Sequence, residues 1–324
     1  MNSGPQILDW LRTATEPLSG AELARRLGCS RAAVWKQVRT LRARGFDIQG
    51  RPARGYVLAA EPTTFDQQSI EAALHGRWRR IAWYPELDTT QRTARELADG
   101  GAPEGTVVVA DRQRRGRGRL GRQWQSPAGV NLYCTILLRP SLAPAIVPQL
   151  ALVGGLAVAD AVTAELGTAP ALKWPNDVLI GGRKVAGILT EMQAELERVR
   201  YVLMGIGVNV NQERFPASLG QTATSLARLA GRPIDRARFT ARLLAALEAR
   251  YGRFVSEGLA SMRRDWESLS CLHGRTVRVT VADHVTAGRV VGLDEDGALL
   301  IAGRDGEVTR VTAGEVTLRR EATG

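Results

Sequence analysis

The sequence predicts an α+β protein with an N-terminal winged helix-turn-helix, a central mixed or antiparallel sheet backed by helices, and a small C-terminal β-barrel. Capping signals and helical spacing fill the first sixty residues, and strand-like runs alternate with helical segments as far as about residue 270. Short alternating runs separated by Asp-Gly turns fill the last fifty residues. We expect domains at residues 1–62, 63–270 and 271–324.

The bulk composition indicates a basic globular protein. Of its 324 residues, 44% are hydrophobic and 24% are charged, and the net charge of +11 favours phosphate-bearing partners. The three cysteines are far apart and show no disulfide framework or metal-ligand spacing. We expect a cytoplasmic protein with no membrane partner, because the N-terminus lacks a signal-peptide pattern and the apolar run at residues 150–159 is too short to span a bilayer.

The first sixty residues contain the helix caps and the turn of a helix-turn-helix. Ser19 and Glu22 form a capping box, Gly28 can end that helix in a left-handed conformation, and Ser30 can cap the next helix. Apolar runs on both sides of residues 50–55 then predict a β-hairpin with a basic tip. The first sixty residues hold ten Arg/Lys and four Asp/Glu, a net of +6.

This charge distribution favours DNA binding over a protein-interaction module with a solvated basic face. The second helix would present its residues to the major groove, and the hairpin would lie along the DNA backbone. The candidate DNA-binding residues are Ser30, Arg31, Ala32, Lys36 and Arg39 on the helix, with Arg51 and Arg54 on the hairpin.

The central segment is expected to mix helices and strands. Helices are expected at residues 69–74, 89–98 and 148–166, and strands at residues 106–110, 130–138, 171–174, 178–180, 185–192 and 199–210. Tight turns such as Gly181-Gly182 favour antiparallel neighbours. No Walker-type loop is present, and a doubly wound parallel sheet is not expected.

An arginine-rich loop follows the expected strand at residues 106–110. Residues 111–122 read DRQRRGRGRLGR, with six arginines interleaved by three glycines. Glycine lets the backbone approach a ligand closely, and arginine binds carboxylate or phosphate through a planar fork. A solvated charge run is the alternative, and the interleaved glycines favour a site for an anionic ligand.

A second cationic motif is KWPND at residues 173–177, followed across a hairpin by Arg183 and Lys184. The hairpin should bring Lys173 and Lys184 into one neighbourhood. Two ammonium groups beside an arginine loop would repel one another unless an anion lies between them.

Two weaker motifs complete the set. Residues 205–211, GIGVNVN, end a strand at which an Asn could contact a base edge, although a simple turn is the alternative. Residues 87–91, LDTTQ, open a helix that Asp88 or Thr89 could cap, and the amides of that helix start could bind a small polar group. The three histidines are scattered and form no catalytic arrangement.

The sequences GRGRLGR and KWPND together resemble the signatures of bifunctional biotin–protein ligases that also repress biotin genes. The resemblance spans nearly the whole chain. It implies a core similar to class II aminoacyl-tRNA synthetases and an SH3-like barrel at the end. It also implies two steps: biotin attacks the α-phosphate of ATP to give biotinyl-5'-AMP, and a lysine of a biotin carrier protein then displaces AMP.

The resemblance also assigns residues and partners. It implies Mg²⁺ with ATP, operator DNA and a homodimer. Arg119 and Lys184 are the expected catalytic residues, with Arg122 and Lys173 supporting. The implied biotin site comprises Thr89, Thr90, Gln91, Gln113, Arg117, Gly118, Arg119 and Lys184, and the implied ATP site comprises Arg119, Arg122, Lys173, Asn176, Asp177 and Asn209.

Two positions depart from the family pattern. Gln91 stands where the family often has Asn, so its contact with biotin is left open. Leu120 replaces an arginine, and we expect this position to tune repression or retention of the adenylate. The alternatives are a lipoate–protein ligase-like enzyme and a biotin-responsive transcription factor without ligase activity.

Overall fold

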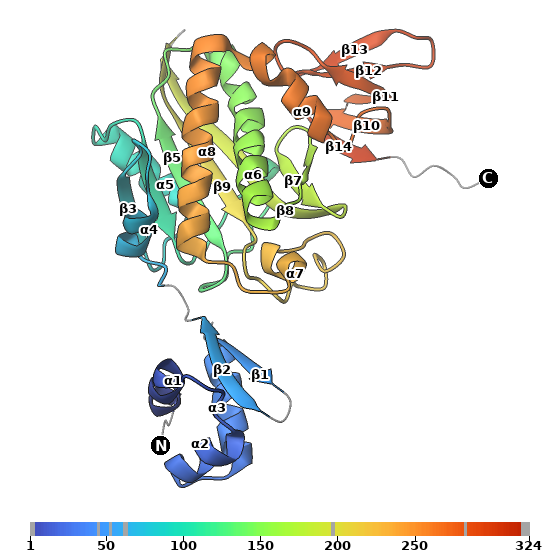
Figure 1. Ribbon diagram of the computed structural model, residues 1–324. Helices are drawn as coiled ribbons and strands as arrows, with labels where there is room; N and C mark the ends of the chain where they lie inside the picture. Colours follow the sequence, from blue (N-terminus) through green and yellow to red (C-terminus); the bar gives the residue numbers. More distant parts are fainter. Residues whose placement is uncertain are drawn as a thin grey trace, which may run out of the picture. The chain divides into compact units, whose positions relative to one another are not determined.

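The computed structural model describes residues 4–43, 46–51, 54–60, 64–195, 198–281 and 284–318. The chain divides into two compact units, Met1–Thr64 and Phe65–Gly324. Each unit has its own hydrophobic core (Figure 1).

The N-terminal unit is the predicted winged helix-turn-helix. Its elements are α1 (Gly4–Thr13), α2 (Gly20–Leu27), α3 (Arg31–Ala43), β1 (Asp47–Arg51) and β2 (Gly55–Ala60), and the two strands pair antiparallel. The predicted caps form, but the Glu22 side chain pairs with Arg26 and does not complete the predicted capping box. Ser19 Oγ accepts a hydrogen bond from the Glu22 amide at 3.1 Å, and Gly28 ends α2 at φ 63°.

The second unit contains a seven-stranded sheet in the order β3-β4-β5-β9-β8-β7-β6. Strands β3 and β4 are parallel and the other neighbours are antiparallel, so the predicted mixed sheet is confirmed. The strands are β3 (Arg80–Tyr84), β4 (Thr106–Ala110), β5 (Leu132–Leu138), β6 (Ala171–Lys173), β7 (Asp177–Ile180), β8 (Arg183–Glu195) and β9 (Arg198–Val208).

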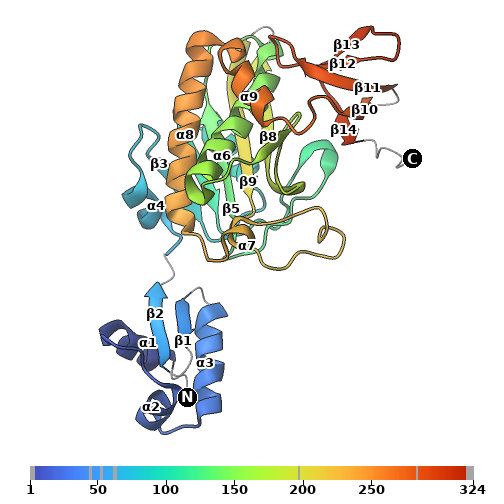
Figure 2. The same ribbon diagram turned by 45° about the vertical axis from the view of Figure 1, so that its right-hand side comes forward.

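Helices cover both faces of this sheet (Figures 1 and 2). Helices α6 (Leu150–Leu166) and α8 (Arg236–Glu257) pack on one face, and α5 (Thr90–Asp99) packs on the other. Strand β4 shows the result, because Val107 and Val109 join the core under α6 while Val108 faces α5. This burial on both faces explains the continuous apolar run that precedes the arginine-rich loop.

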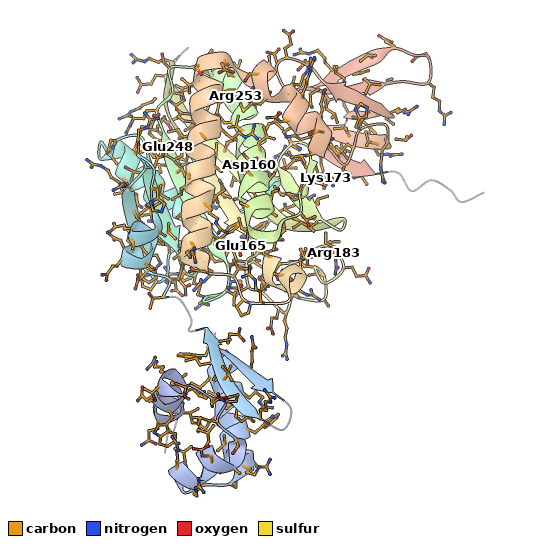
Figure 3. The ribbon with its side chains drawn as sticks, in the orientation of Figure 1. Asp160, Glu165, Lys173, Arg183, Glu248 and Arg253 are labelled. Carbon is orange, nitrogen blue, oxygen red and sulfur yellow. The ribbon has the colours of Figure 1, made fainter. Side chains whose placement is uncertain are left out.

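One long element differs from the prediction. The helix expected at residues 148–166 consists of a 3₁₀ segment, η2 (Pro144–Gln149), followed by α6. Together they span Pro144–Leu166, which is long and apolar enough to cross a membrane, but 72% of its most apolar window is buried inside the protein. It is a core helix by position, and ion pairs anchor its polar residues: Asp160 binds Arg250 at 2.7 Å, and Glu165 binds Arg232 at 2.9 Å (Figure 3).

The C-terminal segment forms a five-stranded antiparallel sheet in the order β13-β12-β11-β10-β14. The expected small C-terminal β domain is confirmed, with β10 pairing with both β11 and β14. The strands are β10 (Thr276–Val281), β11 (His284–Leu293), β12 (Leu299–Ala302), β13 (Val308–Val311) and β14 (Glu315–Leu318).

Short helical segments connect these layers. They are α4 (Gln67–Ala73), η1 (Arg119–Gly121), α7 (Leu226–Ala230), η3 (Leu259–Met262) and α9 (Arg263–Leu269). The indole of Trp174, in the turn between β6 and β7, donates to the Gly297 carbonyl at 3.0 Å and joins the C-terminal sheet to the core.

Candidate functional site

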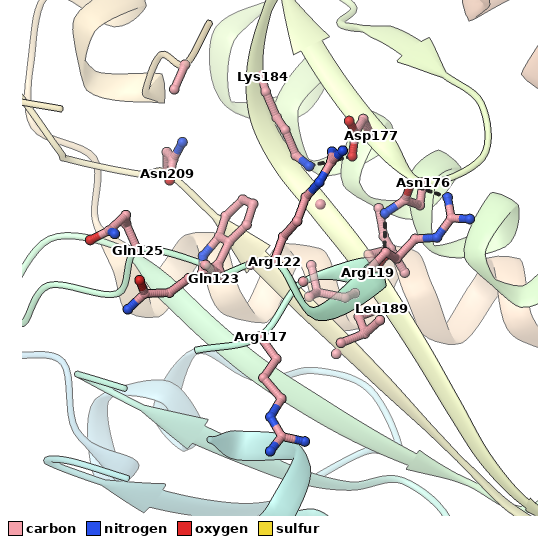
Figure 4. A pocket seen from close by; sticks show the side chains of 18 of the residues that line it. Arg117, Arg119, Arg122, Gln123, Gln125, Asn176, Asp177, Lys184, Leu189 and Asn209 are labelled. Carbon is pink, nitrogen blue, oxygen red and sulfur yellow. Dashed lines mark hydrogen bonds and ion pairs between the residues drawn. The ribbon is translucent and has the colours of Figure 1, made fainter. Parts of the chain in front are cut away.

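A cavity of about 490 Å³ opens at one end of the central sheet (Figure 4). The arginine-rich loop, the turn between β6 and β7, and strands β8, β9 and β14 all contribute to its walls. The structure brings all the ligand-binding candidates of the core to this cavity: Thr89, Thr90, Gln91, Gln113, Arg117, Gly118, Arg119, Arg122, Lys173, Asn176, Asp177, Lys184 and Asn209.

One end of the cavity is built from the start of α5. Thr89 caps the helix by accepting a hydrogen bond from the Arg92 amide at 3.0 Å. Gln113 Oε1 accepts from the Thr90 amide at 2.9 Å, and Gln113 Nε2 donates to Ser126 at 3.1 Å. The expected free amides are therefore partly occupied, because Gln113 already satisfies the one at Thr90.

Gln91 lies deeper in the same wall. Its Nε2 donates to the Leu189 carbonyl at 3.0 Å, and Gly205 makes room for it, since an added Cβ there would lie 3.0 Å from Nε2. Its Oε1 is buried and has no hydrogen-bond partner among the described residues. A buried unpaired acceptor is costly, and a ligand N–H would satisfy it.

The arginine-rich loop is folded, which argues against a solvated charge run. The Gly118 amide donates to the Arg122 carbonyl at 2.7 Å, and the Trp124 amide donates to the Gly116 carbonyl at 2.9 Å. A Cβ on Gly116 would lie 2.4 Å from the Trp124 carbonyl oxygen, so the loop needs glycine there. Leu120 projects at its tip with φ 55° and 75% exposure.

Arg119 and Arg122 bind protein partners in this structure. Arg119 donates to Asn176 Oδ1 at 3.0 Å and to the Gly314 carbonyl at 3.2 Å, and its partial burial lowers its pKa. Arg122 pairs with the Glu315 carboxylate; their hydrogen bond raises the pKa of Arg122 and lowers that of Glu315. Arg117 extends away from both (Figure 4).

Lys184 forms an ion pair with Asp177, 2.5 Å between Nζ and Oδ1, and lies 5.3 Å from the centre of the Trp124 ring. The expectation that only a bound anion could reconcile these cations is therefore wrong. Asp177 and Glu315 supply carboxylates, and the sequence prediction assigned no charge-neutralising role to either. Lys173 lines the cavity without an ion pair in the described part of the chain, and Arg183 lies at the other end of the β6–β7–β8 strands (Figure 3).

Asn176 and Asn209, two residues of the implied ATP site, already use their side-chain amides in contacts with the protein. Asn176 Nδ2 donates to the Ile188 carbonyl at 2.9 Å, while Asn209 Nδ2 donates to the Thr224 carbonyl at 3.1 Å. Asn209 is buried, and its backbone amide donates to Val185 at 2.8 Å. These contacts hold the surrounding strands and loops together.

Comparison with known proteins gives matches to three protein families. Residues 83–209 match the biotin/lipoate A/B protein ligase family, residues 5–57 match an HTH domain, and residues 272–319 match the biotin protein ligase C-terminal domain. The bifunctional ligase/repressor BirA of Bacillus subtilis is 38% identical over 311 residues, covering 95% of each chain. The Escherichia coli BirA is 34% identical over 302 residues, covering 93% of this chain and 92% of that protein.

The chain belongs to the bifunctional biotin ligase/repressor family. Among solved structures, biotin protein ligase from Aquifex aeolicus in complex with biotin and ATP matches with a TM-score of 0.66 and 33% identity. The match covers 75% of this chain and all of that one.

The ligase core also contains cavity residues that the sequence prediction missed. Trp124 directly follows the arginine-rich loop, and its indole Nε1 is buried with no partner among the described residues. Gly207 gives the ring its space, because a Cβ there would lie 2.6 Å from it. Residues 205–208 belong to β9 and do not form a turn. The glycines at 205 and 207 instead leave room for the side chains of Gln91 and Trp124 in the cavity wall.

Two other segments were missed. Phe215, Leu219, Thr222 and Ala223 line the cavity, and the amide of Lys184 donates to Thr222 at 2.7 Å. Gly314 and Glu315 come from the C-terminal sheet, in which no site residue was expected. Of these missed residues, only Trp124 lies beside a motif that the sequence analysis identified, two positions after the arginine-rich loop.

In the repressor unit, the candidate residues lie on the solvent-exposed face of α3. Ser30 Oγ accepts from the Ala33 amide at 3.2 Å and so caps the helix. Arg31, Ala32, Lys36 and Arg39 are exposed, as is Arg54 beside the hairpin turn. The side chain of Arg51 lies outside the described residues.

Proposed function

We propose that this chain is a biotin–protein ligase that forms biotinyl-5'-AMP from biotin and ATP, transfers biotin to a lysine of a biotin carrier protein, and represses biotin genes through its N-terminal unit. The observation that carries the ligase proposal is the convergence of Arg119, Arg122, Lys173 and Lys184 on one cavity beside an unpaired buried acceptor.

Biotin fits the end of the cavity at α5. The ureido ring of biotin offers N–H donors, and Gln91 Oε1 is an acceptor without a partner. Thr90 and Gln113 supply further polar groups, and Arg117 and Gly118 lie on the loop that would cover the tail of biotin. The longer Gln91 is suited to this contact because its own Nε2 is anchored to β8.

ATP fits the cationic end. The biotin carboxylate attacks the α-phosphorus, and the bond to pyrophosphate breaks. Negative charge then grows on the phosphate oxygens, and positioned cations stabilise it. Arg122 and Lys184 would exchange Glu315 and Asp177 for phosphate, while Arg119 would remain fixed by Asn176 and Gly314.

The transfer step uses the same groups. The lysine amine attacks the acyl carbon of the mixed anhydride, and AMP leaves with the bonding electrons. The arginine-rich loop supports the proposal because it is folded and lines the cavity, where it would shield the adenylate from water.

Magnesium would accompany ATP. The described residues contain no cluster of three or more metal-ligating side chains, and Asp177 and Glu315 are the carboxylates that line the cavity. This donor set fits an ion held mainly by phosphates and water, with one protein carboxylate at most as a direct ligand. Bound Mg²⁺ would neutralise phosphate charge.

The repressor role implies operator DNA as a partner, and we propose a cytoplasmic homodimer, because most operators of helix-turn-helix proteins are two-fold symmetric. Sedimentation with and without biotinyl-5'-AMP would measure the dimer.

A labelling assay tests the ligase. The full-length protein, incubated with radioactive biotin, ATP and a purified biotin carrier domain, should label the carrier. Lipoate or octanoate in place of biotin should give no product. Absence of biotin transfer refutes the enzyme, and preferential transfer of lipoate supports the alternative ligase.

A further inference from the structure

Trp35 is an exposed aromatic side chain on α3. It exposes 53% of its surface and is the one aromatic residue among the large hydrophobic side chains that are exposed in the described part of the chain. The buried face of the same helix consists of Val34, Val38 and Leu41. Trp35 therefore contributes nothing to the core of its unit, and its apolar surface faces water.

Arg39 is stacked on this ring. Its guanidinium carbon lies 4.9 Å from the centre of the Trp35 ring, one helical turn further along α3. The stack restricts a long side chain, which lowers the entropy lost when its fork binds a partner. Arg31 and Ala32 lie one turn earlier on the same face.

The charges of this face are uncompensated. Helix α3 has the sequence RAAVWKQVRTLRA, without an acidic residue, and neither Arg31, Lys36 nor Arg39 forms an ion pair with another described residue. On α2, in contrast, Arg26 pairs with Glu22. An exposed apolar ring amid unpaired cations fits a polyanion that also offers apolar contacts, and duplex DNA has phosphates, base edges and thymine methyl groups.

We propose that Trp35 and Arg39, here called the reading pair, determine which DNA sequence the protein selects. Arg39 presents its fork to a guanine edge in the major groove, and the Trp35 ring packs against the methyl group of an adjacent thymine. Lys36 contacts phosphate and contributes affinity without sequence preference. The inference rests on the proposed repressor function and extends it to the residues that read the bases.

A selection experiment tests the reading pair. The full-length wild-type protein, with biotin and ATP present, selects duplexes from a random library. The dissociation constants of each variant are then measured for the best-enriched duplex and for a scrambled duplex of the same composition, at several salt concentrations. Melting temperatures verify that each variant is folded.

Trp35→Ala should lower the ratio of the two affinities at least about tenfold and leave the salt dependence unchanged. Arg39→Lys keeps the charge but loses the planar fork, and it should lower the ratio similarly. Lys36→Ala is the matched control on the same helix: it should weaken both duplexes alike and reduce the salt slope by about one.

Three results would overturn the inference. Equal weakening of both duplexes by Trp35→Ala would make the ring a non-specific contact. An unchanged affinity ratio with an altered molecular mass would make it a contact between two copies of the chain. Failure of the wild-type protein to enrich any sequence would refute the repressor function as well. The first two results, in contrast, refute only the role of the reading pair.

Discussion

The guanidinium of Arg122, in the arginine-rich loop, pairs with the carboxylate of Glu315 at the start of the last described strand. The adjacent Gly314 carbonyl accepts a hydrogen bond from Arg119. Two arginines of the loop are therefore held by the C-terminal sheet, which makes that sheet part of the ligand cavity. In this structure the same contacts occupy two of the cations that we propose bind phosphate.

Replacing Glu315 with Gln should release Arg122 at little cost in stability. Both side chains are largely exposed, so their pair contributes about 1 kcal/mol or less. The freed guanidinium should lower the KM for ATP about threefold, or less than 1 kcal/mol, in a pyrophosphate-release assay. Glu307→Gln, at an exposed carboxylate in the turn that precedes β13, should change nothing. A loss of activity as large as that of Arg122→Ala would instead place Glu315 in contact with substrate.

The pH dependence of this pair follows from its pKa shift. Arg122 lowers the pKa of Glu315 below its ordinary value of 4.5. The interaction is therefore fully present above the ordinary pKa and is lost as the pH falls through the lowered one. The ATP effect of Glu315→Gln should be constant across neutral pH and should disappear only in acid.

Removing either of the two main cations should slow adenylate formation strongly. Arg119→Ala and Lys184→Ala each remove a cation that we propose stabilises the developing phosphate charge, and we expect single-turnover rates about 10²–10³ lower. Arg183→Ala is the matched control. Arg183 precedes Lys184 on β8, where adjacent side chains point to opposite faces, and Arg183 does not line the cavity. Rates within twofold of the wild-type rate, in a variant with an unchanged melting temperature, would reject the role of that cation.

Local signals explain which parts of the fold could be predicted. The cap at Ser19, the left-handed Gly28 and the strand at residues 106–110 are each set by neighbouring residues, and the structure confirms them. Helix α8 was not predicted, although Phe239, Leu243 and Leu247 repeat at helical spacing on its buried face. Strand β3 pairs in parallel with β4, a pairing that α5 makes possible and that no local pattern specifies.

The residues of the candidate site could also be predicted only in part from the sequence. The arginine-rich loop and KWPND are compact motifs, so their residues could be named before their contacts were known. The partners of their cations could not, because Arg122 and Glu315 lie 193 positions apart and meet only through packing of the C-terminal sheet. The roles of the glycines at 205 and 207 likewise depend on side chains from other segments, Gln91 and Trp124.

Gln91→Met tests the unpaired acceptor. Methionine has a similar length but neither accepts the proposed ligand N–H nor donates to Leu189. We expect biotin to bind about tenfold more weakly by calorimetry, the loss typical of one hydrogen bond to a buried group. Stability should change by only about 1 kcal/mol, because the variant loses one hydrogen bond and one unsatisfied oxygen together. Unchanged biotin affinity would show that Oε1 does not contact the ligand.

Trp174→Phe should loosen the C-terminal sheet. The buried Trp174 indole donates to the Gly297 carbonyl, and its loss leaves that carbonyl unpaired at a cost of about 1–3 kcal/mol in urea unfolding. Trp83→Phe provides the control, because the Trp83 Nε1 is buried and has no partner among the described residues. It should be neutral or slightly stabilising. Equal destabilisation by both substitutions would attribute the effect to lost ring volume.

Deletion of residues 1–62 should separate the two proposed activities. The N-terminal unit has its own core, while Phe65 is buried in the second unit under Arg236, 4.1 Å from the ring centre, so the cut leaves that anchor in place. Carrier labelling should persist, and salt-sensitive DNA binding should vanish, since the exposed cations of α3 are gone. Mobility shifts at two salt concentrations measure the second effect. DNA binding retained by the truncated protein would place the nucleic-acid site within residues 63–324.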